Sequence, residues 1–173
     1  MNLAPKGFKD HPYSYHQELI LVIENVTNLG LGIARDNGWV VQIAFVLPGE
    51  KVRARIFRNH KSYSDADCIE VLEKSPDRVD PHCSLFGTCG GCQYQSVKYS
   101  TQLQWKRNQV IDNFERISSL HVDVLPVVPS PNQYGYRSKL TPHYEKAHSS
   151  DRRKIGFLRY GSVSYTHLRA HET

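Results

Sequence analysis

The chain has 173 residues, a hydrophobic fraction of 39%, a formal net charge of +5 and an isoelectric point near 9.0. This length allows one or two small domains. No apolar run is long enough to cross a bilayer, which excludes a membrane-spanning protein. The polar N-terminus lacks the apolar core of a secretory signal, so we expect a cytoplasmic protein. The moderate positive charge fits an RNA or DNA partner, and it equally fits a soluble protein without one.

After a polar tail at residues 1–16, residues 17–74 show short β-rich runs separated by turn signals. The runs are Glu18–Glu24, Asn28–Ile33, Trp39–Val46, Glu50–Arg58 and Asp67–Leu72. Asn37-Gly38 is a strong hairpin signal, and Pro48-Gly49 turns the chain before the fourth run. Five short strands of this kind predict a small closed barrel of the oligonucleotide-binding (OB) type.

The fourth run has one apolar face and one basic face. Val52, Ala54 and Ile56 alternate with Lys51, Arg53 and Arg55, which is typical of a half-buried strand. Together with Arg58, the basic face is suited to following a phosphate backbone. The alternative is an ordinary solvated strand whose charges prevent pairing with other chains. Both interpretations remain open at this point.

A linker at residues 75–82 leads into a loop with three cysteines, Cys83, Cys89 and Cys92. Three thiolates predict a metal site that still lacks one ligand, and soft sulfur ligands suit zinc or an iron–sulfur cluster. Gly90-Gly91 lets the backbone wrap closely and aim N–H groups at sulfur. Disulfides are less favoured because there is no secretory signal. The spacing does not choose between zinc and iron, and Cys68 is interpreted as a packed thiol.

The chain then predicts a helix and further strands. Residues 97–117 carry an apolar stripe at helical spacing, which predicts packing against the cysteine loop. Strands are expected at 124–128, 136–144 and 154–160. An aromatic–basic patch comprises Tyr134, Tyr136, Arg137 and Lys139. Such a patch is suited to stacking bases and pairing phosphates, and a β-hairpin with exposed cations is the alternative.

Several of these motifs resemble those of a known family. Cys89-Gly-Gly-Cys92-Gln-Tyr-Gln95, followed by residues of the predicted helix, closely resembles the RNA uracil-5-methyltransferases, which methylate uridine in 23S ribosomal RNA or transfer RNA. The matching helix residues are Tyr99, Gln102, Leu103, Lys106, Val110, Arg116 and Ile117. The strand-rich region resembles that family's TRAM domain, an RNA-binding barrel. Tyr136-Arg137-Ser138-Lys139 resembles its Tyr-Arg-Asn-Lys segment, with serine in place of asparagine.

The resemblance implies that Cys83, Cys89 and Cys92 hold a [4Fe–4S] cluster, with a fourth cysteine expected just past Ser162. It implies RNA binding by Lys51, Arg53, Arg55, Arg58, Arg137 and Lys139. It also implies an S-adenosylmethionine-dependent, monomeric enzyme of ribosomal RNA processing, with ribosomal RNA favoured over transfer RNA. Residues 83–162 would then be the cluster loop, the helix and the start of a central α+β domain.

The resemblance also implies a C-terminal Rossmann methyltransferase domain, which is missing from this chain. We therefore expect an N-terminal fragment that has no catalytic residues and is inactive by itself. Residues 163–173 look like the translation of a sequencing-library adapter, so they are excluded from the reasoning. The alternative function is a non-catalytic RNA-binding module with a zinc knuckle, whose fourth ligand would be His82, His143 or His148. An electron-transfer role for a cluster is less well supported.

Overall fold

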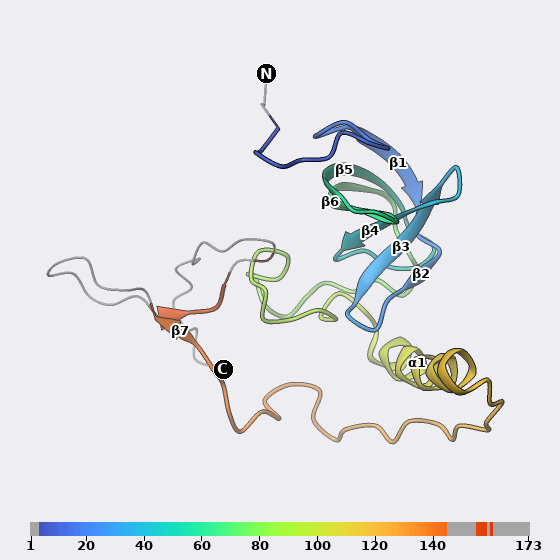
Figure 1. Ribbon diagram of the computed structural model, residues 1–173. Helices are drawn as coiled ribbons and strands as arrows, with labels where there is room; N and C mark the ends of the chain where they lie inside the picture. Colours follow the sequence, from blue (N-terminus) through green and yellow to red (C-terminus); the bar gives the residue numbers. More distant parts are fainter. Residues whose placement is uncertain (1–3, 145–154, 159, 161–173) are drawn as a thin grey trace, which may run out of the picture. The chain divides into compact units, whose positions relative to one another are not determined.

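The computed structural model describes residues 4–144, 155–158 and 160. The chain divides into two compact units. One contains the chain up to Val79 together with Ser96–Lys98, and the other contains Asp80–Gln95 and the chain from Tyr99 onward. The first unit is a curled β-sheet, and the second contains the cysteine loop and a helix (Figure 1).

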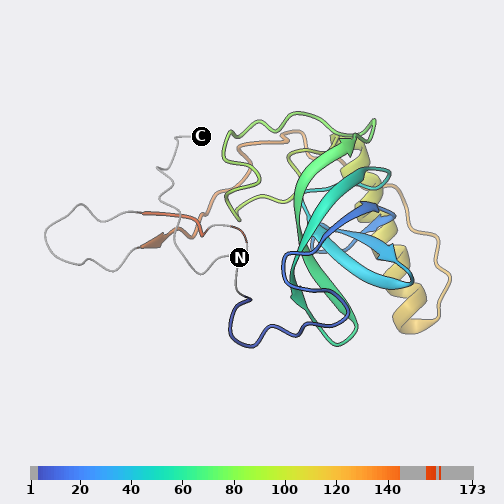
Figure 2. The same ribbon diagram turned by 90° about the horizontal axis from the view of Figure 1, so that it is seen from above.

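The sheet of the first unit has six strands. They are β1 (Glu18–Val22), β2 (Asn25–Val26), β3 (Leu31–Asp36), β4 (Trp39–Ala44), β5 (Lys51–Asn59) and β6 (Tyr63–Glu73). The strand order is β1-β5-β6-β4-β3-β2, and the curl of the sheet is visible in Figure 2. Every neighbouring pair is antiparallel except β4 and β6, which run parallel.

Six strands form where five were predicted, because one run of chain pairs with two different partners. Between β1 and β2, the Ile23 N–H donates to the Glu50 carbonyl at 2.8 Å, while the Glu24 N–H donates to the Ile33 carbonyl at 2.8 Å. The chain therefore leaves the neighbourhood of β5 and joins β3 within two residues. The two ends of the strand order are connected in this way, which is consistent with an OB-like fold.

The alternation predicted for β5 is confirmed. Val52, Ala54 and Ile56 are fully buried, and they pack in one core with residues from the other strands. The further core members are Tyr13, Leu21, Ile23, Ala34, Val41, Ile43, Val46 and Ala66. The predicted hairpin also forms, with φ of 48° at Asn37 and 84° at Gly38 between β3 and β4. Such positive angles suit a tight turn between twisted strands.

Part of the N-terminal tail packs on the barrel. Tyr13 is buried, and its hydroxyl donates to the Asp36 carboxylate at 2.9 Å. Burial, followed by this hydrogen bond, raises the pKa of Tyr13 to about 12, so the hydroxyl stays protonated as a donor at neutral pH. The buried Asn59 side chain donates to the carbonyls of Lys9 and Tyr13 at 2.7 and 2.6 Å. These contacts tie the tail to the end of β5.

The second unit contains α1 (Tyr99–Ser118), within two residues of the predicted helix. It ends at Ser118, and the next residue, Ser119, adopts a left-handed φ of 53°. The predicted packing against the cysteine loop is confirmed, but polar and aromatic groups make it. Gln102 donates to the Tyr94 carbonyl at 3.2 Å, and the Tyr94 and Trp105 rings meet edge to face at 6.0 Å. No helix of the described chain is long and apolar enough to cross a membrane.

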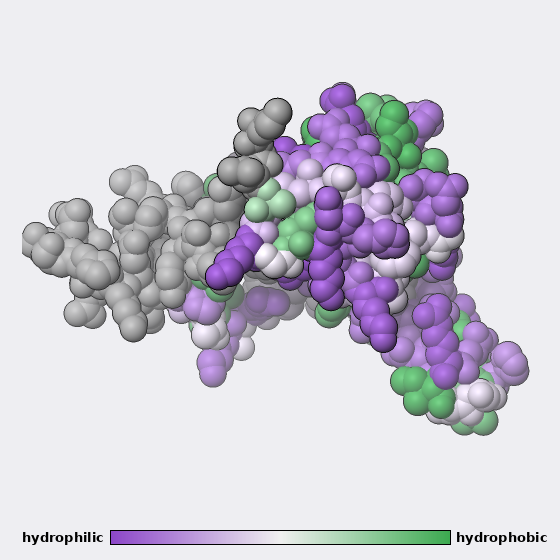
Figure 3. Space-filling view, turned by 45° about the horizontal axis from the view of Figure 1, so that its top comes forward, coloured by the Kyte–Doolittle hydropathy of each residue, from purple (hydrophilic) through white to green (hydrophobic). Residues whose placement is uncertain are grey.

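The apolar stripe of α1 is not buried within the described residues. Val110 and Phe114 are each 42% exposed, and Ile117 is 81% exposed. Figure 3 shows green, hydrophobic surface beside predominantly purple, hydrophilic surface on the coloured part of the face that it displays. The helix is therefore held by its N-terminal half, where Gln102 and Trp105 lie.

The prediction of a strand at residues 124–128 is wrong. The described chain from residue 119 to 142 has no regular strand, and β7 (His143–Tyr144) pairs only with β8 (Ile155–Gly156). The apolar side chains at Leu125 and Val128 are 78% and 87% exposed, so no packing partner favours a sheet there. Most of the predicted strand at 136–144 is likewise irregular. Residue 154 lies outside the described chain.

Candidate functional site

The cysteine loop is closed at its base by two short paired segments. The Val79 N–H donates to the Ser96 carbonyl at 2.9 Å, and the Lys98 N–H donates to the Asp77 carbonyl at 3.0 Å. Ser96 is buried, which fixes the backbone at the point where the loop ends. Both arms of the loop, residues 80–95, therefore start from a defined backbone position.

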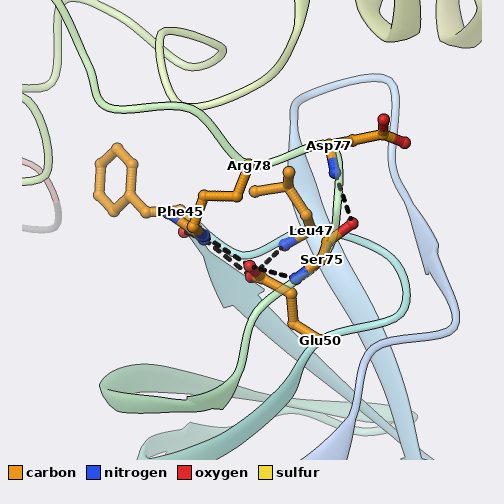
Figure 4. Close-up of polar contacts among 6 residues, drawn as sticks. All are labelled: Phe45, Leu47, Glu50, Ser75, Asp77 and Arg78. Atoms are coloured by element: carbon orange, nitrogen blue, oxygen red, sulfur yellow. Dashed lines mark hydrogen bonds and ion pairs between the residues drawn. The ribbon is translucent and has the colours of Figure 1, made fainter.

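A buried ion pair in the first unit anchors this base (Figure 4). Glu50 has no exposed surface, and its carboxylate accepts hydrogen bonds from the Leu47 N–H at 2.8 Å and the Ser75 N–H at 3.3 Å. The Arg78 guanidinium binds both carboxylate oxygens and donates to the Phe45 carbonyl at 2.9 Å. A two-pronged pair of this kind satisfies the buried Glu50 charge and fixes the linker through the half-buried Arg78.

Sequence reasoning missed the role of Glu50, although one signal was present. Glu50 has the same parity along the chain as the inward-facing Val52 and Ala54. A charged residue in phase with a buried face requires a partner, because an unpaired buried charge is costly. Nothing in the local sequence identifies that partner as Arg78, which lies 28 residues further along.

The three loop cysteines are free thiols, with Cys83 and Cys89 half-buried and Cys92 exposed. Two of the sulfurs accept hydrogen bonds from the loop itself. The Gly91 N–H donates to the Cys89 sulfur at 3.3 Å, and the Gln95 side-chain amide donates to the Cys92 sulfur at 3.2 Å. Hydrogen bonds to sulfur of this kind are a feature of iron–sulfur sites, where they tune the reduction potential.

The paired glycines permit close backbone approach. A Cβ atom at Gly91 would lie 3.3 Å from the Cys89 sulfur, and one at Gly90 would lie 3.1 Å from the Leu158 carbonyl oxygen. The Gly90 N–H donates to that carbonyl at 2.9 Å, and the Tyr160 N–H donates to the Thr88 carbonyl at 3.0 Å. The loop therefore pairs with the segment that ends at Tyr160.

The three cysteine thiols are suitable ligands for a soft metal, but in the described chain they do not surround one common centre. Within residues 4–144, 155–158 and 160, no three side chains of cysteine, histidine, aspartate or glutamate lie close enough together to hold a metal ion. The candidate ligand His82 packs instead against the Tyr134 ring, with a centroid distance of 4.9 Å. His148 and the position just past Ser162 lie outside the described residues. In chemical type, three free thiols fit zinc or an iron–sulfur cluster.

Cys68 is a packed thiol, as predicted. It is half-buried in β6 and packs against the barrel core. Burial raises the pKa of the Cys68 thiol, and the nearby Glu50 carboxylate adds to the rise. A neutral thiol is a poor nucleophile and a poor metal ligand.

The basic face of β5 is largely neutralised by carboxylates on neighbouring strands. Lys51 pairs with Glu73 at 3.1 Å. Arg53 pairs with Glu70 at 2.6 Å and with Glu18 at 4.0 Å, and Arg55 pairs with Asp67 at 3.8 Å. These contacts agree with the alternative of an ordinary solvated strand face. Arg58 differs, because it is exposed and makes no ion pair with any described residue.

The predicted aromatic–basic patch of the second unit is exposed. Tyr134 and Tyr136 are 50% and 65% exposed, and Arg137 and Lys139 are also exposed. Neither cation forms an ion pair within the described part of the chain. The patch lies on irregular backbone before β7, so the hairpin alternative is not realised at these residues. Free cations beside exposed rings are suited to contacting single-stranded nucleic acid.

No protein-family model matches the chain. Several relatives that match it are named uncharacterized RNA methyltransferases. The relative from Thermotoga maritima is 38% identical over 81% of this chain and 30% of its own length. The relative from Clostridium acetobutylicum is 35% identical over 86% of this chain and 32% of its own length. A Listeria monocytogenes relative is 39% identical over 72% of this chain and 27% of its own length. The chain thus spans about a third of their length.

Among solved structures, one match is the Pyrococcus abyssi tRNA (uracil-54, C5)-methyltransferase in complex with S-adenosyl-L-homocysteine. It is 27% identical and covers 62% of this chain and 23% of that chain, with a TM-score of 0.37. A superposition this loose carries no argument about the fold. The sequence relationship does not depend on it. Over about a third of their length, the chain is therefore similar to proteins that are named RNA methyltransferases.

Proposed function

We propose that this chain is the RNA-binding and cluster-bearing part of an S-adenosylmethionine-dependent RNA (uracil-C5)-methyltransferase that acts on 23S ribosomal RNA. The observation that carries the proposal is the sequence match to relatives named RNA methyltransferases. The match of Cys89–Gln95 to the uracil-5-methyltransferase motif supports uracil C5 as the target. Residues 163–173 have no part in this function.

In this proposal, Cys83, Cys89 and Cys92 hold a [4Fe–4S] cluster, which has a structural role. The N–H groups that reach two of the sulfurs support this assignment, since hydrogen bonds to sulfur are typical of cluster sites. The pairing of the loop with the segment ending at Tyr160 also supports it.

A chimera tests the function directly. Residues 1–162 are joined to the remaining length of the Thermotoga maritima relative, and methyl transfer from S-adenosylmethionine to uridine C5 is measured. The substrates are 23S ribosomal RNA and transfer RNA, and the control is the relative's segment without this chain. We expect 5-methyluridine in ribosomal RNA only. Product in transfer RNA alone would contradict the ribosomal assignment, and no RNA binding by the chimera would contradict the function.

Arg58 is expected to contribute more to RNA affinity than any other cation on β5. Each contact between a cation and a phosphate of a single strand adds about 0.7 to the slope of log affinity against log salt. Arg58→Ala should remove about that much of the slope. Arg53→Ala is the matched control, because Arg53 lies on the same strand and is already paired with Glu70. The measurement is the binding of a single-stranded uridine-containing RNA at several salt concentrations. Equal effects of the two substitutions would contradict the assignment.

A further inference from the structure

The Gln95 side chain connects the two ends of the cysteine loop. Its carbonyl oxygen accepts from the Cys83 backbone N–H at 2.9 Å, and its NH₂ group donates to the Cys92 sulfur at 3.2 Å. One amide therefore contacts both the first and the last cysteine of the loop. This half-buried side chain therefore bridges Cys83 and Cys92 by two hydrogen bonds.

The amide can adopt only one orientation in this setting. If it were flipped, its oxygen would face the Cys92 sulfur and its NH₂ group would face the Cys83 N–H. The second contact would set one donor against another, because a backbone N–H cannot accept a hydrogen bond, and this excludes the flipped orientation. The observed orientation thus places an N–H group at the Cys92 sulfur.

The backbone that carries Gln95 is fixed on both sides. Tyr94 is held by the hydrogen bond from Gln102 and by the edge contact with Trp105. On the other side, Ser96 and Val97 are 1% and 4% exposed. A side chain on backbone that is restrained in this way holds its hydrogen-bond partners at set positions, which pre-organises a ligand set.

We propose that Gln95 is a positioning residue for the thiolate ligands of the loop. It sets the distance between the Cys83 and Cys92 arms, and it donates a hydrogen bond to the Cys92 thiolate. The inference rests on the proposed function insofar as the loop binds a metal. Residues that hydrogen-bond to a metal ligand without touching the metal usually strengthen metal binding about 10- to 100-fold. Their hydrogen bonds to sulfur also tune its electron density.

The test uses Co²⁺ as a probe for thiolate ligands in the full chain. Gln95→Leu is expected to weaken Co²⁺ binding about 10- to 100-fold. It should also move the sulfur-to-cobalt charge-transfer band to lower energy, because a sulfur without its N–H donor gives up charge more easily. Gln95→Glu keeps an acceptor for the Cys83 N–H but loses the donor to Cys92, so it should show the same band shift. Gln93→Leu is the matched control, because Gln93 is exposed in the same loop.

The outcomes separate this inference from the function on which it depends. If the unchanged chain binds no Co²⁺ through its thiols, both the metal-binding role of the loop and the role of Gln95 are refuted. If the unchanged chain binds and Gln95→Leu has the same affinity and band energy, only the role of Gln95 is refuted. The midpoint temperature of thermal unfolding of the metal-free variants should match that of the metal-free unchanged chain. A general loss of structure in a variant would lower this temperature.

Discussion

Replacing Glu50 with alanine is expected to destabilise the barrel by roughly 3 kcal/mol, because it removes the buried carboxylate that the half-buried Arg78 and two backbone N–H groups bind. The Glu50 carboxylate is fully buried and accepts from the Leu47 and Ser75 N–H groups as well as from Arg78. Truncation leaves the Leu47 and Ser75 N–H groups without this acceptor, and Arg78 keeps only its hydrogen bond to the Phe45 carbonyl. The measurement is the free energy of unfolding in urea, followed by the fluorescence of Trp39 on the barrel.

The matched control is Glu73→Ala, which removes a carboxylate from an exposed ion pair with Lys51. That change should cost less than about 1 kcal/mol. Arg78→Met should also be strongly destabilising, because it leaves the Glu50 charge buried alone. The double variant Glu50→Ala/Arg78→Met should cost less than the sum of the single changes. Equal unfolding midpoints for Glu50→Ala and Glu73→Ala would show that the buried pair does not stabilise the barrel.

Replacing Cys89 with serine is expected to abolish iron binding by the loop. A serine hydroxyl is a harder ligand than a thiolate and stays protonated at neutral pH, so it does not substitute for soft sulfur. The substitution also removes the sulfur that accepts a hydrogen bond from the Gly91 N–H. The measurement uses the full-length protein, because the fourth ligand is expected past Ser162, and determines iron and acid-labile sulfide after anaerobic reconstitution, together with protease resistance of the loop.

Cys68→Ala is the matched control, because Cys68 packs against the barrel core and its pKa is raised by burial. It should retain the iron content of the unchanged chain. Iron at the same level in Cys89→Ser, with unchanged protease resistance, would remove Cys89 from the ligand set. One equivalent of zinc without iron in the unchanged chain would favour the alternative, a non-catalytic RNA-binding module with a zinc knuckle.

The predictions that succeeded rest on local patterns. The turn at Asn37-Gly38 needs positive φ angles that asparagine and glycine adopt readily, so the hairpin could be predicted from two residues. The alternation of β5 identified its buried face, and helical spacing placed α1 within two residues of its ends. The strand expected at 124–128 failed, because strand formation requires a neighbouring strand that local sequence cannot supply.

By itself, the sequence determined the strand-rich first unit, the helix, the cysteine loop and the resemblance to RNA methyltransferases, because each depends on residue types at short spacing. Only the tertiary structure decided which charges are free and which are paired. Cross-strand register places Glu70 opposite Arg53 and Asp65 opposite Arg58, yet only Arg53 forms an ion pair within the described residues, while Asp65 contacts His60. The same applies to the buried contact between Glu50 and Arg78, because such contacts depend on which segments the fold places side by side.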